Sequence, residues 1–187
     1  MGFRRMDSNQ GHISSLIDRE SIRQCLARLA RGEDRRDASL ISASYWPDAT
    51  DDHGIFVGTF KEYLDWVVPG SPAVLTTLHT LGQSLIELHG NRAMVETHVT
   101  SYHRIDMGTD ERDLVLGGRY LDLMEKRDQE WRIAQRTMLY DWQQDFGQSV
   151  NWSNGLLGMP FIRPHAVGAT KGDYSVELFK RAASGQR

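Results

Sequence analysis

His79 is the residue of this 187-residue chain whose type and position best suit acid–base chemistry. It lies in the middle of VLTTLHTLGQSLIEL, an apolar and threonine-rich segment typical of a β-strand. Because side chains alternate along a strand, His79 shares one face with Thr77 and Leu81 and is expected to be half buried. An isolated histidine of this kind is ordinarily a core residue with a satisfied hydrogen bond, so a catalytic role needs a partner.

Asp34 is the candidate partner. Ile22, Leu26 and Ala30 recur every four residues along a helical segment, and Asp34 continues that row by one step. A carboxylate that extends an apolar stripe points toward the interior, where it needs a hydrogen-bonding partner. When a carboxylate bonds one imidazole nitrogen, it fixes the tautomer and leaves the other nitrogen as a general base near neutral pH. The sequence therefore predicts an Asp34–His79 pair as the catalytic centre.

Polar and aromatic residues near the predicted strands are candidates for substrate contacts. An arginine or tyrosine on the concave face of a sheet could bind a substrate oxygen, although salt bridges within the sheet are the ordinary alternative. Tryptophan and tyrosine suit a pocket wall or a core. The candidate substrate-binding residues are Tyr45, Trp46, Asp51, Tyr102, Arg119, Arg136, Tyr140 and Trp142.

No metal site is predicted. Asp51, Asp52 and His53 are clustered, but strand alternation separates Asp52 from its neighbours, and a turn with solvated charges is the default interpretation. A three-ligand site would have to recruit His79 or Glu96 as well.

Two further histidines and the single cysteine are interpreted as structural. His98 and His103 are five residues apart on one predicted strand and so face opposite sides, and we expect both at the surface or at an interface. Cys25, at helical spacing from the apolar row, is expected to be a small buried residue.

Composition and missing motifs exclude several function classes. The net charge is −3, from 22 basic and 25 acidic residues, so we expect no nucleic-acid or anionic-membrane partner. The chain contains no GxGxxG, P-loop, HExxH, GxSxG or CxxC motif. No apolar stretch approaches the ~20 residues that span a bilayer, and the N-terminal residues do not form a secretory signal, so a cytoplasmic protein is expected.

The first third of the chain has a helical pattern. We predict a helix from Ser14 or Ser15 to about Gly32 and a second from Asp37 to about Tyr45 that Pro47 stops. Two short strands and a helix capped by Thr59 follow.

The remainder changes to strand periodicity. Residues 74–88, 92–106, 112–127 and 130–146 predict long strands joined by short turns, which make an antiparallel meander. Glycines 82, 117 and 118 are candidate bulges that let such strands curl. We therefore predict an α+β fold in which a curved antiparallel sheet forms a cone around N-terminal helices and encloses a pocket.

The chain divides into three expected parts. Residues 1–13 are predicted to form a flexible arm, 14–146 the α+β domain, and 147–187 an irregular segment with a last short helix after Asp173. The apolar loop at 147–170 should cover the pocket mouth or a neighbouring subunit.

Four segments resemble the SnoaL-like branch of the nuclear transport factor 2-like superfamily, over residues 14–146. They are IRQCLARLARGEDRRD, YWPDATDDHGIFVGTF, LTTLHTLGQSLIEL and GGRYLDLMEKRDQEWRIAQRTMLYDW. The resemblance implies an α+β cone with an interior pocket, assembled as a homodimer or homotrimer.

Within that superfamily the chain is most similar to the group typified by scytalone dehydratase, hexachlorocyclohexane dehydrochlorinase and bile-acid 7α-dehydratase. These enzymes use an Asp–His pair without metal or organic cofactor, and Asp34 and His79 match that pair. The helix lysine of the dehydrochlorinase falls at Leu29 and is absent. Arg136 or Arg119 could replace its arginine, and Tyr45 is the nearest candidate for a dehydratase tyrosine.

The resemblance thus implies a cofactor-independent lyase that dehydrates a small hydrophobic, oxygenated ring compound. Two alternatives stay open at this stage. One is a non-catalytic ligand-binding or assembly subunit, like the β subunits of ring-hydroxylating dioxygenases. The other is a polyketide-cyclase-like isomerase that uses the same base.

Overall fold

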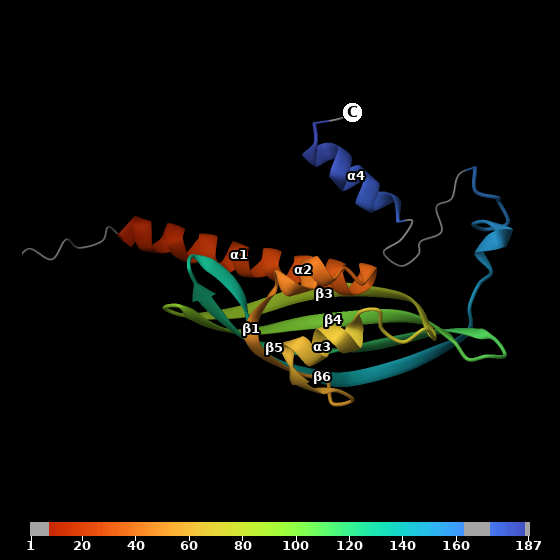
Figure 1. Ribbon diagram of the computed structural model, residues 1–187, viewed down its shortest axis with the longest axis horizontal. Coiled ribbons are helices and arrows are strands. Elements are labelled where there is room, and N and C mark those ends of the chain that lie inside the picture. Colours follow the sequence, from red (N-terminus) through yellow and green to blue (C-terminus); the bar gives the residue numbers. More distant parts are fainter. Residues whose placement is uncertain (1–7, 163–172, 186–187) are drawn as a thin grey trace, which may run out of the picture.

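Helices lie on one side of a curved sheet in the computed structural model, which describes residues 8–162 and 173–185 (Figure 1). The helices are α1 (Ser8–Arg35), α2 (Ala38–Ser42), α3 (Phe60–Val67), the 3-10 helix η1 (Trp152–Asn154) and α4 (Tyr174–Ala183). The strands are β1 (Tyr45–Asp52), β2 (Val57–Thr59), β3 (Val74–His89), β4 (Arg92–Asp106), β5 (Glu111–Arg127) and β6 (Glu130–Gln148). None of the helices in these ranges is both long and apolar enough to cross a membrane.

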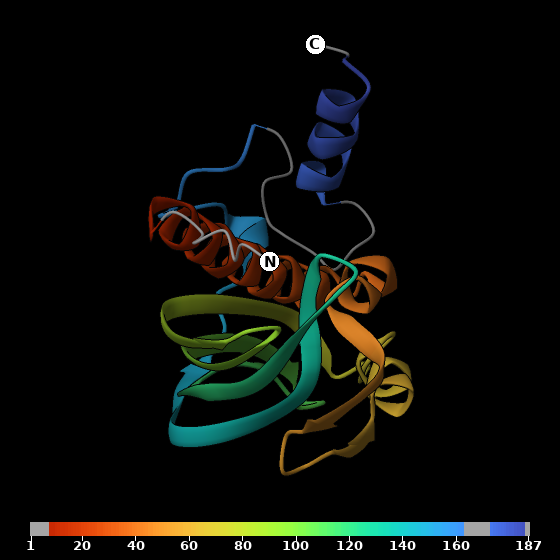
Figure 2. The same cartoon turned by 90° about the vertical axis from the view of Figure 1, so that its left-hand side faces the viewer.

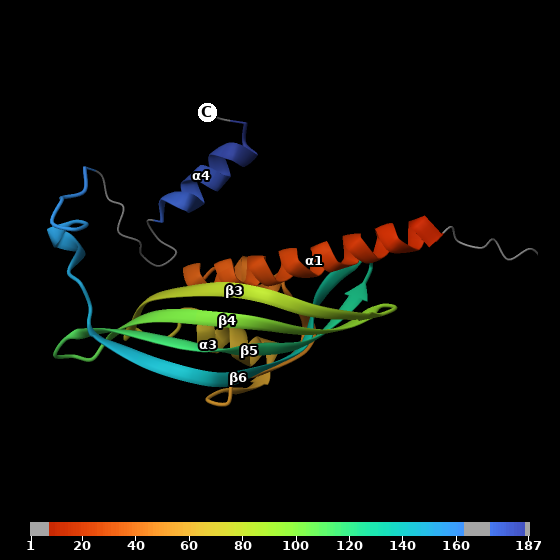
Figure 3. The ribbon, with the colours of Figure 1, turned by 180° about the vertical axis from the view of Figure 1, so that it is seen from behind.

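The six strands form one sheet in the order β2-β1-β6-β5-β4-β3. Strands β3 to β6 make the predicted antiparallel meander, and Figure 3 shows them side by side beneath α1. Strand β1, whose partner the sequence analysis did not assign, pairs with β6 in parallel, so the whole sheet is mixed. Hydrophobic alternation marks a strand but does not encode the direction of a partner that lies far away in the sequence.

Glycine-associated irregularities curl the sheet, as predicted. The β3–β4 register shifts between Leu81 and Ser84, which flank Gly82, and the β5–β6 register shifts between Gly117 and Gly118. Such bulges bend a strand and increase its twist. Figure 2 shows the long strands curving below α1, so the sheet and the helix enclose a common interior.

The predicted helix caps are confirmed, but two boundaries differ. Asp37 caps α2, and Thr59 and Glu62 form a capping box on α3. Helix α1 already begins at Ser8, although its first turns lack an apolar stripe that contacts the core. Pro47 does not stop a helix but lies within β1, where the pairing with β6 is irregular between Tyr45 and Thr50 and tolerates a residue without an N–H.

The core lies between the middle of α1 and the sheet. Its side chains include Ile22, Cys25, Leu26 and Leu29 of α1 packed with Ile86, Val95, Met124 and Ile133 of the strands. This apolar cluster ends one turn before the C-terminus of α1. Glu33 and Asp34 follow there, and they introduce charge beside strand β3, whose His79 bonds Asp34.

The C-terminal segment contacts the end of α1. Asp173 caps α4 and its Oδ2 lies 2.6 Å from Arg35 Nε, while the Arg31 guanidinium stacks 4.5 Å from the centre of the Phe179 ring. Of the 147–170 loop, the structure describes residues up to 162, and residues 163–170 lie outside the described part. Leu157 and Ile162 of this loop are almost fully exposed. The covering role of the loop therefore stays a prediction.

The bulge at Gly118 gives a test of the sheet geometry. A Cβ at Gly118 would lie 2.0 Å from the backbone oxygen of Leu139, which cannot move without breaking the strand pairing. We expect Gly118→Ala to lower the free energy of unfolding by about 1–3 kcal/mol, the usual cost of overpacking. Gly117→Ala is the matched control, because its Cβ would meet the half-exposed Trp142 side chain, which can rotate away. Equal losses in urea unfolding would contradict the assigned register.

Candidate active site

A cavity of about 230 Å³ opens where the apolar core ends. Side chains from α1, α3, the β1–β2 turn and strands β3 to β6 line it. Its apolar walls are Ile55, Trp66, Val67, Val74, Leu116 and Met138, and its ionisable wall residues are Glu33, Arg36, His53, Tyr63, His79, His103, Tyr120 and Tyr140. An apolar pocket with a few converging polar groups is the usual form of a small-molecule site.

The carboxylate of Asp34 binds His79 twice. Asp34 Oδ1 lies 2.8 Å from the ring atom Nδ1, and the backbone N–H of His79 donates to both carboxylate oxygens, at 2.9 and 3.2 Å. The backbone contact exists because β3 is an edge strand, so this N–H has no neighbouring strand to bond. The side chains are 12% and 8% exposed, for His79 and Asp34 respectively. The imidazole is thus fixed in position and in tautomer, with Nδ1 protonated.

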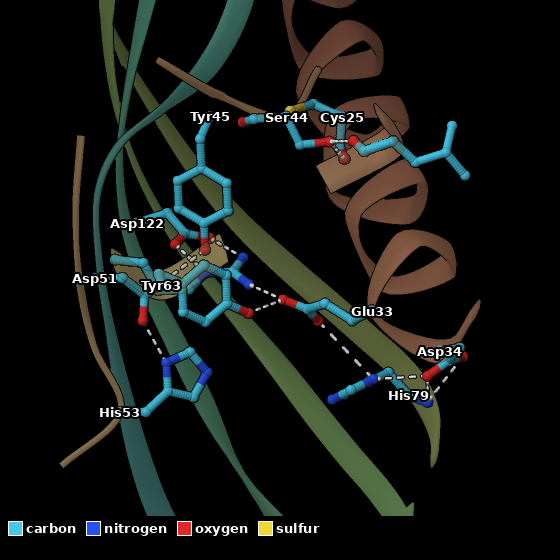
Figure 4. A network of polar contacts seen from close by, with 12 residues as sticks. Cys25, Glu33, Asp34, Ser44, Tyr45, Asp51, His53, Tyr63, His79 and Asp122 are labelled. Atoms are coloured by element: carbon cyan, nitrogen blue, oxygen red, sulfur yellow. Dashed lines mark hydrogen bonds and ion pairs between the residues drawn. The ribbon is translucent and has the colours of Figure 1, made fainter. Parts of the chain in front are cut away.

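The rest of the His79 ring faces the cavity. Figure 4 shows its second nitrogen directed away from Asp34, toward the side where His53 and Tyr63 lie. Burial alone would lower the pKa of the imidazole, but the hydrogen bond to Asp34 and the charges of Glu33 and Asp34 outweigh burial and raise the pKa above its ordinary 6.5. The Asp34–His79 pair therefore stabilises the imidazolium that forms when His79 accepts a proton as a base.

Glu33 is a cavity residue that the sequence interpretation missed. It is 6% exposed, accepts a hydrogen bond from the Tyr63 hydroxyl, and lies 3.9 Å from His79 Nδ1 and 4.0 Å from Arg136 Nη1. Burial, together with the charge of Glu33, raises the pKa of Tyr63 well above 10, so its hydroxyl stays a donor. The sequence carried a signal for Glu33, because Cys25, Leu29 and Glu33 recur every four residues, so Glu33 continues an apolar row as Asp34 does.

Arg136 is buried behind the cavity rather than in its wall. It makes two hydrogen bonds to Asp122, at 2.7 and 2.9 Å, and its guanidinium lies 3.8 Å from the centre of the Tyr120 ring. The strand register sets Asp51, Arg136 and Asp122 side by side on β1, β6 and β5. Burial raises the pKa of Asp122 despite Arg136, and the charges of Asp51 and Glu33 add to it. Arg136 therefore balances buried carboxylates and fixes Tyr120.

A second Asp–His pair occupies the β1–β2 turn. His53 Nδ1 hydrogen-bonds Asp51 Oδ1, and the Tyr45 hydroxyl donates to Asp51 Oδ2 at 2.6 Å. The expected solvated turn is wrong, because Asp51 is 1% exposed and His53 lines the cavity. The alternation that separates Asp52 also sets Asp51 and His53 on one face, and that spacing is the signal that could have found the pair.

His103 also lies in the cavity, and its expected surface position is wrong. Its ring meets the His79 ring edge to face, with centroids 6.2 Å apart. Burial, and then the charge of His79, lowers the pKa of His103 to about 4, so it is neutral at physiological pH. His98 faces the other side of β4 and is exposed, as predicted. The buried alternation Thr97–Val99–Ser101 leads to His103 and marks the inner face.

The candidate substrate-binding residues fall into three groups. Tyr140 lines the cavity, and its hydroxyl donates to the backbone oxygen of His53 at 3.1 Å. Three are buried in the charged network behind it: Tyr45, Asp51 and Arg136. The other four do not line the cavity: Trp46, Tyr102, Arg119 and Trp142.

Local partners explain the positions of that last group. The guanidinium groups of Arg127 and Arg132 lie 4.9 and 4.8 Å from the centre of the Trp46 ring, and Tyr102 donates to Asp113 at 2.8 Å. Arg119 pairs with Asp141, and Trp142 is half exposed. Strand alternation assigns a face only once the bulges are known, and those bulges lie close to several of these residues. Among the described residues, no three His, Cys, Asp or Glu side chains are grouped closely enough to bind a metal ion.

The family model for a SnoaL-like domain matches residues 14–137 of the chain. The chain belongs to the SnoaL-like domain family. This confirms the resemblance found in the sequence, and the curved sheet with its N-terminal helices is the nuclear transport factor 2-like α+β cone. A comparison with curated protein sequences gives no significant match.

Solved structures share the fold of this SnoaL-like protein. The hexachlorocyclohexane dehydrochlorinase LinA-type3 from Novosphingobium barchaimii is 18% identical, with a TM-score of 0.66 over 82% of this chain and 99% of that one. A candidate scytalone dehydratase from Novosphingobium aromaticivorans is 19% identical, with a TM-score of 0.64 over 74% and 93%. The Kfla4162 protein from Kribbella flavida is 16% identical, with a TM-score of 0.63 over 70% and 95%. These likenesses concern the fold alone.

The buried, neutral His103 predicts a pH-dependent loss of stability. Its pKa is about 4 in the folded chain and 6.5 when exposed, so between these values the unfolded chain binds more protons and stability falls as pH falls. This residue should account for up to about 3 kcal/mol of that loss, and His103→Gln should remove it. Urea unfolding from pH 7 to pH 4 measures the difference. The exposed His98→Gln is the control, and an equal effect there would contradict the burial argument.

Proposed function

We propose that this SnoaL-like protein is a cofactor-independent lyase in which His79 removes a proton from a carbon atom of the substrate. The observation that supports it is the 2.8 Å contact of Asp34 Oδ1 with His79 Nδ1, which leaves Nε2 directed into the cavity. A base needs its lone pair toward the substrate and its other nitrogen bonded to a group that stabilises the imidazolium. Asp34 provides that group, and Glu33 adds a second negative charge at 3.9 Å.

The proposed reaction is an elimination, most simply of water. The C–H bond breaks, its electron pair forms the new C=C bond, and the proton goes to His79 Nε2. The bond from the adjacent carbon to oxygen breaks with its electron pair on oxygen, which leaves as water after it gains a proton. The imidazolium then returns its proton to solvent.

The cavity favours a small, hydrophobic and oxygenated ring compound that carries no negative charge. Its volume of about 230 Å³ limits the ligand to a small molecule, and its apolar walls suit a ring. Glu33 lies in the wall, the buried Arg136 is bonded to Asp122, and the guanidinium of Arg36 is bonded to the backbone oxygens of Pro69 and Val74. The wall therefore disfavours a carboxylate or phosphate on the substrate. The dehydratase and dehydrochlorinase among the structural neighbours agree with this class of reaction, although only their fold is shared.

The proposal is tested by removing the base. His79→Asn keeps an amide donor for Asp34 but has no basic nitrogen in the cavity, so kcat/KM should fall about 10²–10⁴-fold. The assay follows ultraviolet absorbance as β-hydroxycyclohexanone, a minimal ring with an acidified C–H and a hydroxyl leaving group, is converted to cyclohexenone. His98→Asn on the outer face is the control.

Full activity in a folded His79→Asn variant would exclude His79 as the base. Product analysis by mass spectrometry separates elimination from isomerisation, because only elimination loses one water. A product of unchanged mass would replace the lyase with an isomerase that uses the same base.

We propose further that the protein assembles as a homodimer or homotrimer through the outer face of the sheet. Four large apolar side chains are exposed there: Leu78, Leu85, Met94 and Leu139. An interface formed by this face would remove these apolar side chains from water, which favours association. Light scattering coupled to size exclusion should give two or three times the 21.3 kDa mass of the chain, and Leu85→Lys should reduce it. A monomer at all concentrations would contradict this assembly.

A further inference from the structure

The cavity contains a second imidazole that is built like the first. His53 bonds Asp51 through Nδ1, and its side chain is 13% exposed while that of Asp51 is fully buried. Its ring stacks on Tyr63, with centroids 5.4 Å apart and planes 13° apart. The Tyr140 hydroxyl bonds its backbone oxygen. The ring, the turn and the carboxylate are therefore all fixed.

The hydrogen bonds around Asp51 determine which nitrogen of His53 is available. Burial raises the pKa of Tyr45 well above 10, so its hydroxyl keeps its proton and donates it to Asp51 Oδ2. Asp51 Oδ1 is then the acceptor for His53, which places a proton on Nδ1. Nε2 is the nitrogen left to exchange a proton with a ligand, and the carboxylate stabilises the ring when both nitrogens are protonated.

The two histidines approach the cavity from opposite sides. His53 follows β1, and His79 lies on β3 at the far edge of the sheet order, yet both line the same space. Figure 4 shows His53 and His79 on separate segments of the chain, with Tyr63 and Glu33 between their partners Asp51 and Asp34. A ligand in this cavity can therefore contact one imidazole on each side.

The other ionisable wall residues are poor proton donors for a departing oxygen. Burial raises the pKa values of Tyr63 and Tyr120 well above 10 and also raises that of Tyr140. The Tyr63 proton already bonds Glu33, and the Tyr140 proton bonds the backbone oxygen of His53. The pKa of His103 is about 4, so its ring is a neutral imidazole at neutral pH and is a poor acid. Arg36 donates to the backbone oxygens of Pro69 and Val74. His53, by contrast, lines the cavity with Nδ1 bonded to Asp51, so its Nε2 is available to a ligand.

We propose that His53 is the general acid of the elimination, with Asp51 as the group that positions it. The inference rests on the proposed lyase function and assigns the second proton transfer. As the C–O bond breaks, the oxygen takes its electron pair and receives the proton of His53 Nε2, so that water leaves. His79 gains the proton from carbon, and each histidine then exchanges with solvent. The substrate class this implies bears a hydroxyl on the carbon next to the one that loses its proton.

A matched pair of substrates separates the acid from the base. β-Hydroxycyclohexanone and β-acetoxycyclohexanone both give cyclohexenone. Acetate can leave as an anion, whereas the hydroxyl group needs a proton so that it leaves as water. His53→Asn keeps an amide donor for Asp51 and has no acidic nitrogen in the cavity. We expect it to lower kcat/KM for the hydroxy compound about 10²–10⁴-fold and to change that for the acetoxy compound less than about tenfold.

The variant His79→Asn should lose activity on both compounds, and His98→Asn on neither. Thermal unfolding of each variant confirms that the loss is not one of folding. Equal losses on the two compounds in His53→Asn, or no loss on either, would overturn the role of His53 while the base role of His79 stands. A wild-type protein that converts neither compound would overturn the lyase proposal and the acid with it.

Discussion

The carboxylate of Asp34 is the contact on which the site depends, because it joins the end of α1 to the open edge of the sheet. It satisfies a backbone N–H that β3, as an edge strand, would otherwise leave without a partner, and it bonds the imidazole of the same residue. One side chain thus links α1 to the edge strand β3 and determines which nitrogen of His79 faces the cavity. An edge N–H, which is a structural liability elsewhere, here positions a functional group.

The charge distribution behind the cavity follows from the same arrangement. Glu33, Asp51 and Asp122 surround the buried guanidinium of Arg136, so this network has more carboxylates than cations. Buried charges are tolerated only when paired, and a protonated histidine facing such a network relieves the imbalance. This explains why the pKa of His79 is raised, whereas that of His103, without a carboxylate of its own, is lowered. His79 and His53 each bond a buried carboxylate, whereas His103 has no such partner and stays neutral.

Much of the fold was predictable, because strand alternation, turn residues and caps are local. The four long strands, the caps at Asp37 and Thr59 and the bulges near Gly82 and Gly117 follow from neighbouring residues. Asp34 was predictable from its helix row. The sheet faces on which Arg119 and Trp142 lie were not predictable, because register shifts in the β5–β6 pair interrupt the alternation. The parallel pairing of β1 with β6 was not predictable either, because it depends on contacts between residues distant in sequence. The sequence also carried signals for Glu33, His53 and His103, in the helical row that ends at Glu33 and in strand alternation. Only tertiary packing, however, brings these three side chains into one cavity.

The central claim is that Asp34 leaves His79 Nε2 as the proton acceptor in the cavity. Nitrogen-15 NMR of histidine-labelled protein tests it directly, because the two ring nitrogens have different shifts in each tautomer. The account predicts that neutral His79 carries its proton on Nδ1, that it titrates above its ordinary 6.5, and that Asp34→Asn lowers its pKa. A neutral His79 with its proton on Nε2, or one whose titration is unchanged in Asp34→Asn, would contradict it.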